Sequence, residues 1–454
     1  MTSAKATAPS GPGDAAAPAR ARRDRALLVA ALLYAVTTAL FAATMLDRLR
    51  QHTAYNHFAL LAEAWLHGRL DLGGNPPDYT GMNDFAVHNG KYFVSFPPFP
   101  AVLLVPVVKL VGGAAHVRDG AFFLGIAGLG PPALLLALER LTSAGRNRRS
   151  LAENGVLAAL FGFGTVYWST AVQGTVWFAA HVVAVPLCAL YLYASVDAAH
   201  PVLAGLAIGL GFATRTPLAF AFPLFLFEAT RAARRADADA DAGFAPRLAG
   251  VALVPLTKRL VLFALPAALV LGALLWHNRA RFGDPFEFGH RMLAIAWRPR
   301  IEKWGLFSYH YLARNLSIVA AGLPFSRVEG APFQINVHGL ALWLTTPLYA
   351  WAIWPRRTGS TFWALAATAA AVAAPSLCYQ NSGWIQFGYR FSNDFAPFLF
   401  AMIAVSGRRF GAGFVGAAAV AIAVNAFGAV TFQRSRFDRF YYVDHTQKVL
   451  VQPD

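Results

Sequence analysis

Long apolar runs separated by short polar segments dominate this sequence. Runs close to 20 apolar residues are typical of transmembrane helices. The pattern predicts an all-α polytopic membrane protein with about 11 transmembrane helices. We expect them at 26–46, 119–141, 152–170, 174–195, two halves of 202–229, 260–280, 336–354, 361–379, 392–406 and 410–431.

Basic residues between the apolar runs predict the orientation of the chain. Placing the basic clusters on the cytoplasmic side puts residues 1–25 inside, as a disordered basic tail, and 432–454 outside. The membrane domain then covers 26–431, with large external loops at 47–118 and 281–335. The apolar stretch 97–113 is short and rich in proline, so we expect an interfacial or re-entrant element there rather than a crossing.

Two interrupted segments predict local structure. Residues 202–229 contain Thr214-Arg215-Thr216-Pro217, and an arginine and a proline at this depth indicate a hairpin of two short helices. Asn56–Leu70 has apolar residues at helical spacing, which predicts a short amphipathic helix along the membrane surface.

Composition narrows the classes of function. The 454 residues are 57% hydrophobic and 14% charged, against about 25% charged in soluble domains. The net charge of +16 comes largely from clusters at the ends of apolar runs, which suit lipid headgroups and not nucleic acid. Cys188 and Cys378 lie inside apolar runs, where they indicate small buried side chains rather than a disulfide or metal pair.

Polar residues that topology does not explain gather on the predicted external side. The first loop contains the dense stretch Asn89-Gly90-Lys91-Tyr92-Phe93, followed by Pro97-Pro98. The split hairpin contributes Arg215, and the loop after residue 379 contributes Arg390 and Asp394. A site on this face is therefore expected.

These stretches resemble motifs of membrane glycosyltransferases of the GT-C superfamily, in particular protein O-mannosyltransferases and lipid A aminoarabinose transferases. The order of the matching segments along the chain carries the resemblance. They are Ala59–Gly68, Asn89–Phe93 with Pro97-Pro98, Gly209–Pro217, Asn278–Gly289 and, more weakly, Gly388-Tyr389-Arg390.

The resemblance implies a GT-C-like fold and an enzyme that moves a sugar from a polyprenyl-phosphate carrier to an acceptor. The acceptor would be a lipid, a glycan or a protein of the cell envelope. The Ala- and Arg-rich composition indicates a bacterial plasma membrane, and the basic clusters place the N-terminus in the cytoplasm and the expected active site on the external face. The chain departs from the family in two places: no carboxylate lies near Ala54–His57, and Phe96 stands where a lysine normally precedes the two prolines.

Sugar transfer of this kind needs a base for the acceptor hydroxyl. Asp84 is the first candidate and Glu63 the second. The alternatives are structural: an aspartate after Asn83 suits a turn, and Glu63 suits a solvated helix face.

Donor-phosphate binding needs cations, and Lys91, Arg215 and Arg390 are the candidates. Arg215 could instead reach the interface, and Arg390 could support aromatic residues. His57 and His290 are candidates for assistance, although a single histidine is more often structural. No spacing demands a metal, and a divalent cation near the acidic first loop is left open.

Two other functions fit parts of the pattern. A transporter or flippase of lipid-linked sugars should have ionisable residues at mid-membrane on several helices, whereas most apolar runs here have none. An inactive GT-C-like scaffold fits the missing acidic motif.

Overall fold

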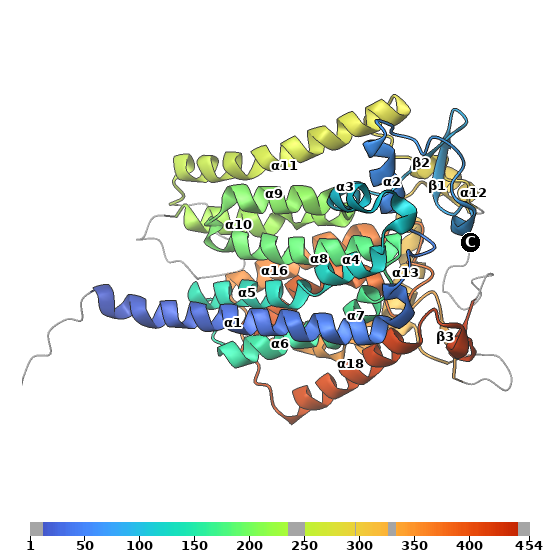
Figure 1. Ribbon diagram of the computed structural model, residues 1–454. Coiled ribbons are helices and arrows are strands. Elements are labelled where there is room, and N and C mark those ends of the chain that lie inside the picture. Colours follow the sequence, from blue (N-terminus) through green and yellow to red (C-terminus); the bar gives the residue numbers. More distant parts are fainter. Residues whose placement is uncertain (1–11, 235–249, 296, 326–332, 444–454) are drawn as a thin grey trace, which may run out of the picture.

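The computed structural model describes residues 12–234, 250–295, 297–325 and 333–443. Most of the helices run alongside one another along one axis, and the small elements α2, β1, β2, α12, α13 and β3 gather at one end of this bundle (Figure 1). The bundle core is built from alanine, leucine, valine and phenylalanine side chains. The end that holds the small elements is the end of interest for function.

Six helical segments in the described ranges are long and apolar enough to cross a membrane, which confirms the predicted all-helical polytopic fold class. The number of crossings, expected to be eleven, stays a prediction. The six segments are α1 (Pro12–Met45), α4 (Asp119–Ala127) continued by α5 (Gly130–Ser143), α8 (Val176–Ser195), α11 (Leu253–Phe282), α16 (Ser360–Leu377) and α18 (Ala412–Thr431).

The split hairpin predicted at 202–229 is present. Helix α9 (Pro201–Phe212) ends before the Arg215 turn, and the 3₁₀ helix η5 (Thr216–Ala221) leads into α10 (Phe222–Ala232). At the opposite end of the hairpin, α10 is tied to the segment just before α9. There the backbone N–H of Asp197 donates to Glu228 Oε2 at 2.7 Å. Other short helices are α6 (Leu151–Phe163), α7 (Tyr167–Ala171) and α17 (Ala396–Val405).

Two sequence expectations need correction, and a third, the short element at 97–113, agrees with the structure. Residues 336–354 do not form one helix, since Gly339 has φ of 130° and Pro347 lacks an N–H donor. They form β3 (Ile335–Asn336), α14 (Leu342–Thr345) and α15 (Ala350–Ile353). Residues 12–25, expected to be disordered, are helical as the start of α1. Helix α3 (Phe99–Val111) has 13 residues, too short for a straight crossing.

The first loop folds around a β-hairpin of β1 (Phe85–His88) and β2 (Lys91–Val94). Asn89 and Gly90 form its two-residue turn with φ of 50° and 71°, as expected for a type I′ turn. The register pairs Phe85 with Val94 at the far end of the hairpin. Asp84 and Ser95 therefore leave the hairpin side by side.

Helix α2 (His57–Leu66) confirms the helix predicted in the first loop but not its surface position. It packs against α3, and seven of its ten residues are buried. The second loop contains α12 (Arg298–Trp304) and α13 (Leu312–Ala321), and the short strand β4 (Tyr441–Tyr442) pairs with β3.

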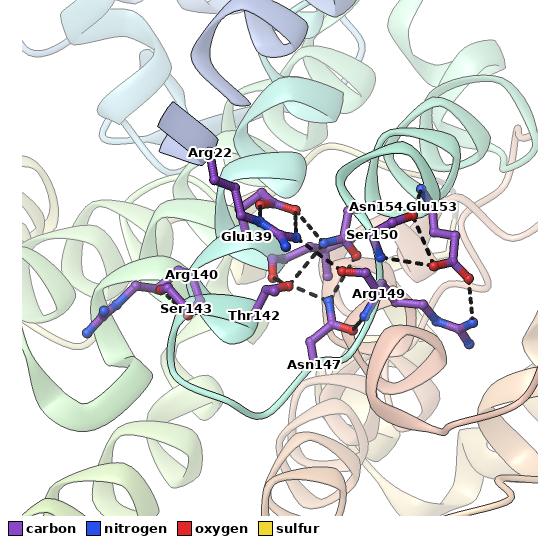
Figure 2. Close-up of polar contacts among 11 residues, drawn as sticks. Arg22, Glu139, Arg140, Thr142, Ser143, Asn147, Arg149, Ser150, Glu153 and Asn154 are labelled. Carbon is purple, nitrogen blue, oxygen red and sulfur yellow. Dashed lines mark hydrogen bonds and ion pairs between the residues drawn. The ribbon is translucent and has the colours of Figure 1, made fainter. Parts of the chain in front are cut away.

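A polar cluster ties α1 to α5 and α6 (Figure 2). Arg22 Nε donates to Glu139 Oε2 at 2.8 Å, and Asn154 Nδ2 donates to Glu139 Oε1 at 2.6 Å. Ser150 and Glu153 form a capping box at the start of α6. These polar and charged groups form hydrogen bonds with one another, so the cluster has a structural role and holds the helices together.

Close packing of α9 on α11 depends on glycine. A Cβ added at Gly205 would fall on the carbonyl oxygen of Phe263 and within 2.8 Å of Pro266 Cγ. Gly272, also on α11, has no neighbouring atom within 4 Å of such a Cβ. Gly205 of α9 is therefore covered by a second helix, whereas Gly272 of α11 is not.

We predict that Gly205→Ala lowers the free energy of unfolding by about 1–3 kcal/mol, because α9 and α11 must move apart. Gly272→Ala is the matched control and should be neutral or slightly stabilising, since alanine favours a helix. Unfolding midpoints of the purified protein in detergent measure both. Equal midpoints for the two variants would contradict this account of the packing.

Candidate functional site

A cavity of about 410 Å³ opens among the small elements. Its wall comes from the turn before β1, the segment after β2, the ends of α8, α9 and α11, and the loop after α16. The charged side chains in the wall are Asp84, Arg215, Arg281 and Arg390. Three arginines and one carboxylate thus line a single space.

Asp84 reaches the cavity because of the turn that holds it. Its φ is 60°, a left-handed conformation that aspartate tolerates better than most residues. The indole Nε1 of Trp177, at the start of α8, donates to Asp84 Oδ2 at 2.7 Å. Burial raises the pKa of Asp84 above its ordinary value, although the Trp177 bond and the charge of Arg390 act in the opposite direction.

His57 supports this turn from behind and does not line the cavity. Its Nε2 lies 2.8 Å from the carbonyl oxygen of Asn83, so Nε2 carries the proton, and its ring stacks on Phe85 with centroids 4.3 Å apart. Burial lowers the pKa of His57 to about 4, so the ring is neutral. The geometry gives His57 a positioning role next to Asp84.

The Pro97-Pro98 step joins the hairpin to the Arg215 turn. The N–H of Phe99, just after the prolines, donates to the carbonyl of Ala213 at 2.9 Å. Arg215 lies two residues after Ala213 and forms an ion pair with Asp394. Its Nη2 is 2.7 Å from Asp394 Oδ2, and its Nε is 3.2 Å from both carboxylate oxygens. The hairpin, the split helix and the start of the last helices therefore meet here.

Asp394 is fully buried and has a second partner, His181 of α8, whose Nδ1 lies 3.0 Å from Asp394 Oδ1. Nδ1 is therefore the protonated nitrogen, and the buried Nε2 has no hydrogen-bond partner. Sequence reasoning named Asp394 only as a loop residue and missed His181. A single histidine in the middle of an apolar run gives no signal for such a contact.

Arg390 lies at the start of the 3₁₀ helix η9 (Arg390–Asp394). Its Nη1 donates to the carbonyl of Ile385 at 2.8 Å, and no carboxylate among the described residues forms an ion pair with it. The Phe391 ring lies under both Arg390 and Arg215, with guanidinium-to-centroid distances of 5.4 and 5.1 Å. One ring therefore holds two positive charges at the cavity.

Arg281 was not singled out from the sequence. It lies near the end of α11 and donates to the carbonyl of Val94 at 2.7 Å and to Asn278 Oδ1 at 2.8 Å. Neighbouring Phe282 packs on Phe93 of β2 with centroids 5.1 Å apart. Arg281 lies where the predicted external loop 281–335 begins, and the sequence gives no signal for its contact with Val94, 187 positions away.

One side of the cavity is apolar. Leu271, Leu274 and Leu275 lie on one face of α11, and Asn278 and Arg281 continue the same face toward the polar end. The outer face of α11 is exposed over most of its length. A ligand with an apolar chain and an anionic head would match this gradient of polarity.

The structure brings together four of the seven site residues proposed from the sequence and leaves three outside. Asp84, Arg215, Arg390 and His290 line the cavity. Burial, with the charge of Arg281, lowers the pKa of His290 to about 4.

Lys91 and Glu63 lie elsewhere, so the site roles predicted for them have no support in the geometry. Lys91 sits at the turn end of the hairpin, where its side chain is 63% exposed and pairs with Asp71 at 3.1 Å. Strands rise about 3.3 Å per residue, so the four residues from Asp84 to His88, the partner of Lys91, separate the two ends by roughly 13 Å. Glu63 accepts a bond from the N–H of Ala114 at 3.3 Å.

The described residues contain no group of three or more histidine, cysteine, aspartate or glutamate side chains that could hold a metal ion. Asp84 is the one carboxylate that the described residues contribute to the cavity wall. The two cysteines are free, as expected. The alternative with a divalent cation stays untested.

No protein-family model and no curated protein matches this chain. Among solved structures it is similar to the apo crystal structure of the Archaeoglobus fulgidus oligosaccharyltransferase, with a TM-score of 0.49 and 16% sequence identity. The similarity covers 89% of this chain and 54% of that chain, so this chain spans about half the length of the archaeal protein.

We predict that Asp394→Asn lowers the free energy of unfolding by about 3–5 kcal/mol, because it leaves Arg215 without its buried counter-charge. Asp71→Asn is the matched control. It breaks the exposed pair with Lys91 and should cost at most about 1 kcal/mol. Unfolding in detergent measures both, and similar losses for the two variants would contradict the importance given to the buried pair.

Proposed function

We propose that this chain is an integral-membrane glycosyltransferase that moves a sugar from a polyprenyl-phosphate carrier to an acceptor hydroxyl. The observation that carries the proposal is the arrangement of one carboxylate and three arginines in a cavity with an apolar wall. The motif resemblance to GT-C enzymes points to the same reaction. The acceptor class is a lipid, a glycan or a protein.

In this reaction Asp84 acts as the base. It takes the proton of the acceptor hydroxyl while the acceptor oxygen bonds to the sugar C1 and the bond between C1 and the phosphate oxygen breaks. The polyprenyl phosphate leaves with the electron pair of that bond. Burial makes the Asp84 carboxylate more basic than an exposed aspartate, which favours proton transfer near neutral pH.

The arginines bind the donor phosphate and stabilise the charge that grows on it. Arg390 is the principal candidate, because it lines the cavity without a carboxylate partner among the described residues. Arg215 contributes less net charge, because Asp394 offsets it, and Arg281 approaches from the α11 side. The leucine face of α11 would hold the start of the polyprenyl chain.

The proposed location is a bacterial plasma membrane, with the cavity on the external face. The charge pattern supports this orientation. Arginines at the end opposite the cavity meet Asp197 and Glu228, as in the 2.5 Å contact of Arg231 Nη2 with Asp197 Oδ1. Loop arginines favour the cytoplasmic side, which puts the N-terminus there.

We predict that Asp84→Asn lowers the transfer rate by about 10²–10⁴-fold, because the base is lost. Asparagine suits this test because it also tolerates the left-handed φ of position 84. Arg390→Gln should lower the rate by about 10²–10³-fold through lost stabilisation of the leaving phosphate. Purified protein in nanodiscs, supplied with polyprenyl-phosphate hexoses and pentoses and a mixed acceptor preparation, provides the measurement.

Glu63→Gln and Lys91→Ala are the matched controls, since they change the same residue classes outside the cavity, and both should transfer at the wild-type rate. Full activity of Asp84→Asn would rule out the proposed base. Absence of turnover with every donor would favour the inactive scaffold, and carrier movement across the bilayer without transfer would favour the flippase.

We predict that Trp177→Phe moves the acidic limb of the pH–rate profile to higher pH by roughly one unit. The indole N–H bond stabilises the Asp84 carboxylate, so its removal raises the pKa of Asp84 further. Trp168→Phe is the control, because the Trp168 indole bonds Thr44 away from the cavity. An unmoved limb, or one moved to lower pH, would contradict Asp84 as the titrating base.

A further inference from the structure

A second hollow, of about 420 Å³, lies against the cavity and shares part of its wall. Tyr55, Asn83, Ile295 and Trp297 line both spaces. We call the second space the aromatic groove. Its remaining lining residues are Thr80, Gly81, Met82, Phe85, Val87, Tyr92 and Ala294.

The hairpin register separates the groove from the cavity. Side chains alternate between the two faces of a strand, so Phe85 and Val87 share one face, and Tyr92 lies opposite Val87 on that same face. These three residues line the groove, while Asp84, the residue before Phe85, lines the cavity. Asp84 therefore stands at the boundary between the two spaces.

The lining of the groove is aromatic and carries no charge. Tyr55, Phe85, Tyr92 and Trp297 supply rings, and no aspartate, glutamate, lysine, arginine or histidine is among its lining residues. The adjoining cavity, by contrast, has four charged residues in its wall. A ligand of the groove is therefore uncharged where it contacts these rings.

Polar groups at the ring edges have no partner in the part of the chain that the structure describes. The indole Nε1 of Trp297 is buried and makes no hydrogen bond. Among the described residues, no hydrogen bond engages the hydroxyls of Tyr55 and Tyr92 or the side-chain amide of Asn83. The buried Trp297 donor is unfavourable without a partner, and the three half-buried groups are open to a ligand, so the groove favours a ligand that is itself rich in hydrogen-bonding groups.

We propose that the aromatic groove binds an uncharged sugar of the acceptor and presents its hydroxyl to Asp84. Sugar rings have apolar faces that suit aromatic rings and hydroxyl edges that suit the free amide, indole and phenol groups. An acyl chain would leave those groups unbonded, and an anionic or cationic ligand would find no counter-charge. This inference rests on the proposed function and names the acceptor as a neutral glycan.

The test is binding of neutral oligosaccharides to the purified full chain in nanodiscs, without donor, by isothermal titration calorimetry. The probes are trisaccharides of mannose, glucose and arabinose, with a glucuronic acid trisaccharide and an uncharged hexapeptide as comparisons. At least one neutral trisaccharide should bind, and the glucuronic acid trisaccharide and the peptide should not. Tyr92→Ala and Trp297→Phe should each weaken binding about tenfold, which corresponds to about 1.4 kcal/mol.

Tyr309→Ala and Trp354→Phe are the matched controls, because both residues are largely exposed and line neither space. They should bind the sugar with wild-type affinity. No binding by any neutral trisaccharide, tighter binding of the peptide, or equal affinities for the wild type and both groove variants would each overturn the proposal.

Hydrolysis of the polyprenyl-phosphate sugar, with water as the acceptor, tests the proposed function separately. Water then supplies the oxygen that bonds to C1, and the groove is not needed. Donor hydrolysis without sugar binding would overturn the proposed sugar site in the groove but not the proposed transferase. Sugar binding with neither donor hydrolysis nor transfer to the bound sugar overturns the transferase, and the acceptor role of the groove with it.

Discussion

The buried ion pair between Arg215 and Asp394 organises the functional end of this molecule. It joins residues 179 positions apart in sequence, one in the turn of the split hairpin and the other just before α17. A fully buried carboxylate costs several kcal/mol without a partner, so this contact cannot be lost without moving both segments. The Phe99–Ala213 backbone bond attaches the first loop to the same turn. Three distant parts of the chain thus share one anchor, and the cavity lies among them.

The two ends of the bundle use arginine differently. At the end opposite the cavity, Arg22 of α1 meets Glu139 of α5 and Arg231 of α10 meets Asp197 before α9, so charge there joins separate elements. At the cavity, Arg281 and Arg390 bond to backbone carbonyls, and no carboxylate among the described residues forms an ion pair with either. Backbone carbonyls orient a guanidinium without neutralising it. The cavity therefore keeps a positive field in a partly desolvated space, where an anion is attracted more strongly than at the surface.

The sequence predicts the architecture better than the site. Apolar runs identified the main helices because that signal is local, whereas the β-hairpin around Asn89-Gly90 was not predicted. Gly339 and Pro347 broke an apolar stretch that looked continuous, since hydropathy does not register backbone conformation. Within the site, Lys91 lies close to Asp84 in sequence, yet the hairpin carries it to the opposite end. His181 and Arg281 escaped detection because their partners come from remote segments.

The carboxylate that the family carries near Ala54–His57 is absent here, but Asp84 lies at the cavity that this stretch lines. Tyr55, from that stretch, lines the same cavity as Asp84, so a carboxylate reaches this space from a different part of the loop. Its position depends on a left-handed turn, the Trp177 bond and the His57 contact with Asn83, none of which a simple connector would need. An aspartate that only stabilised a turn in contact with water would not need these three restraints. The Trp177 bond orients the Asp84 side chain, and the other two restraints fix the turn that carries it, so the carboxylate is held toward the cavity.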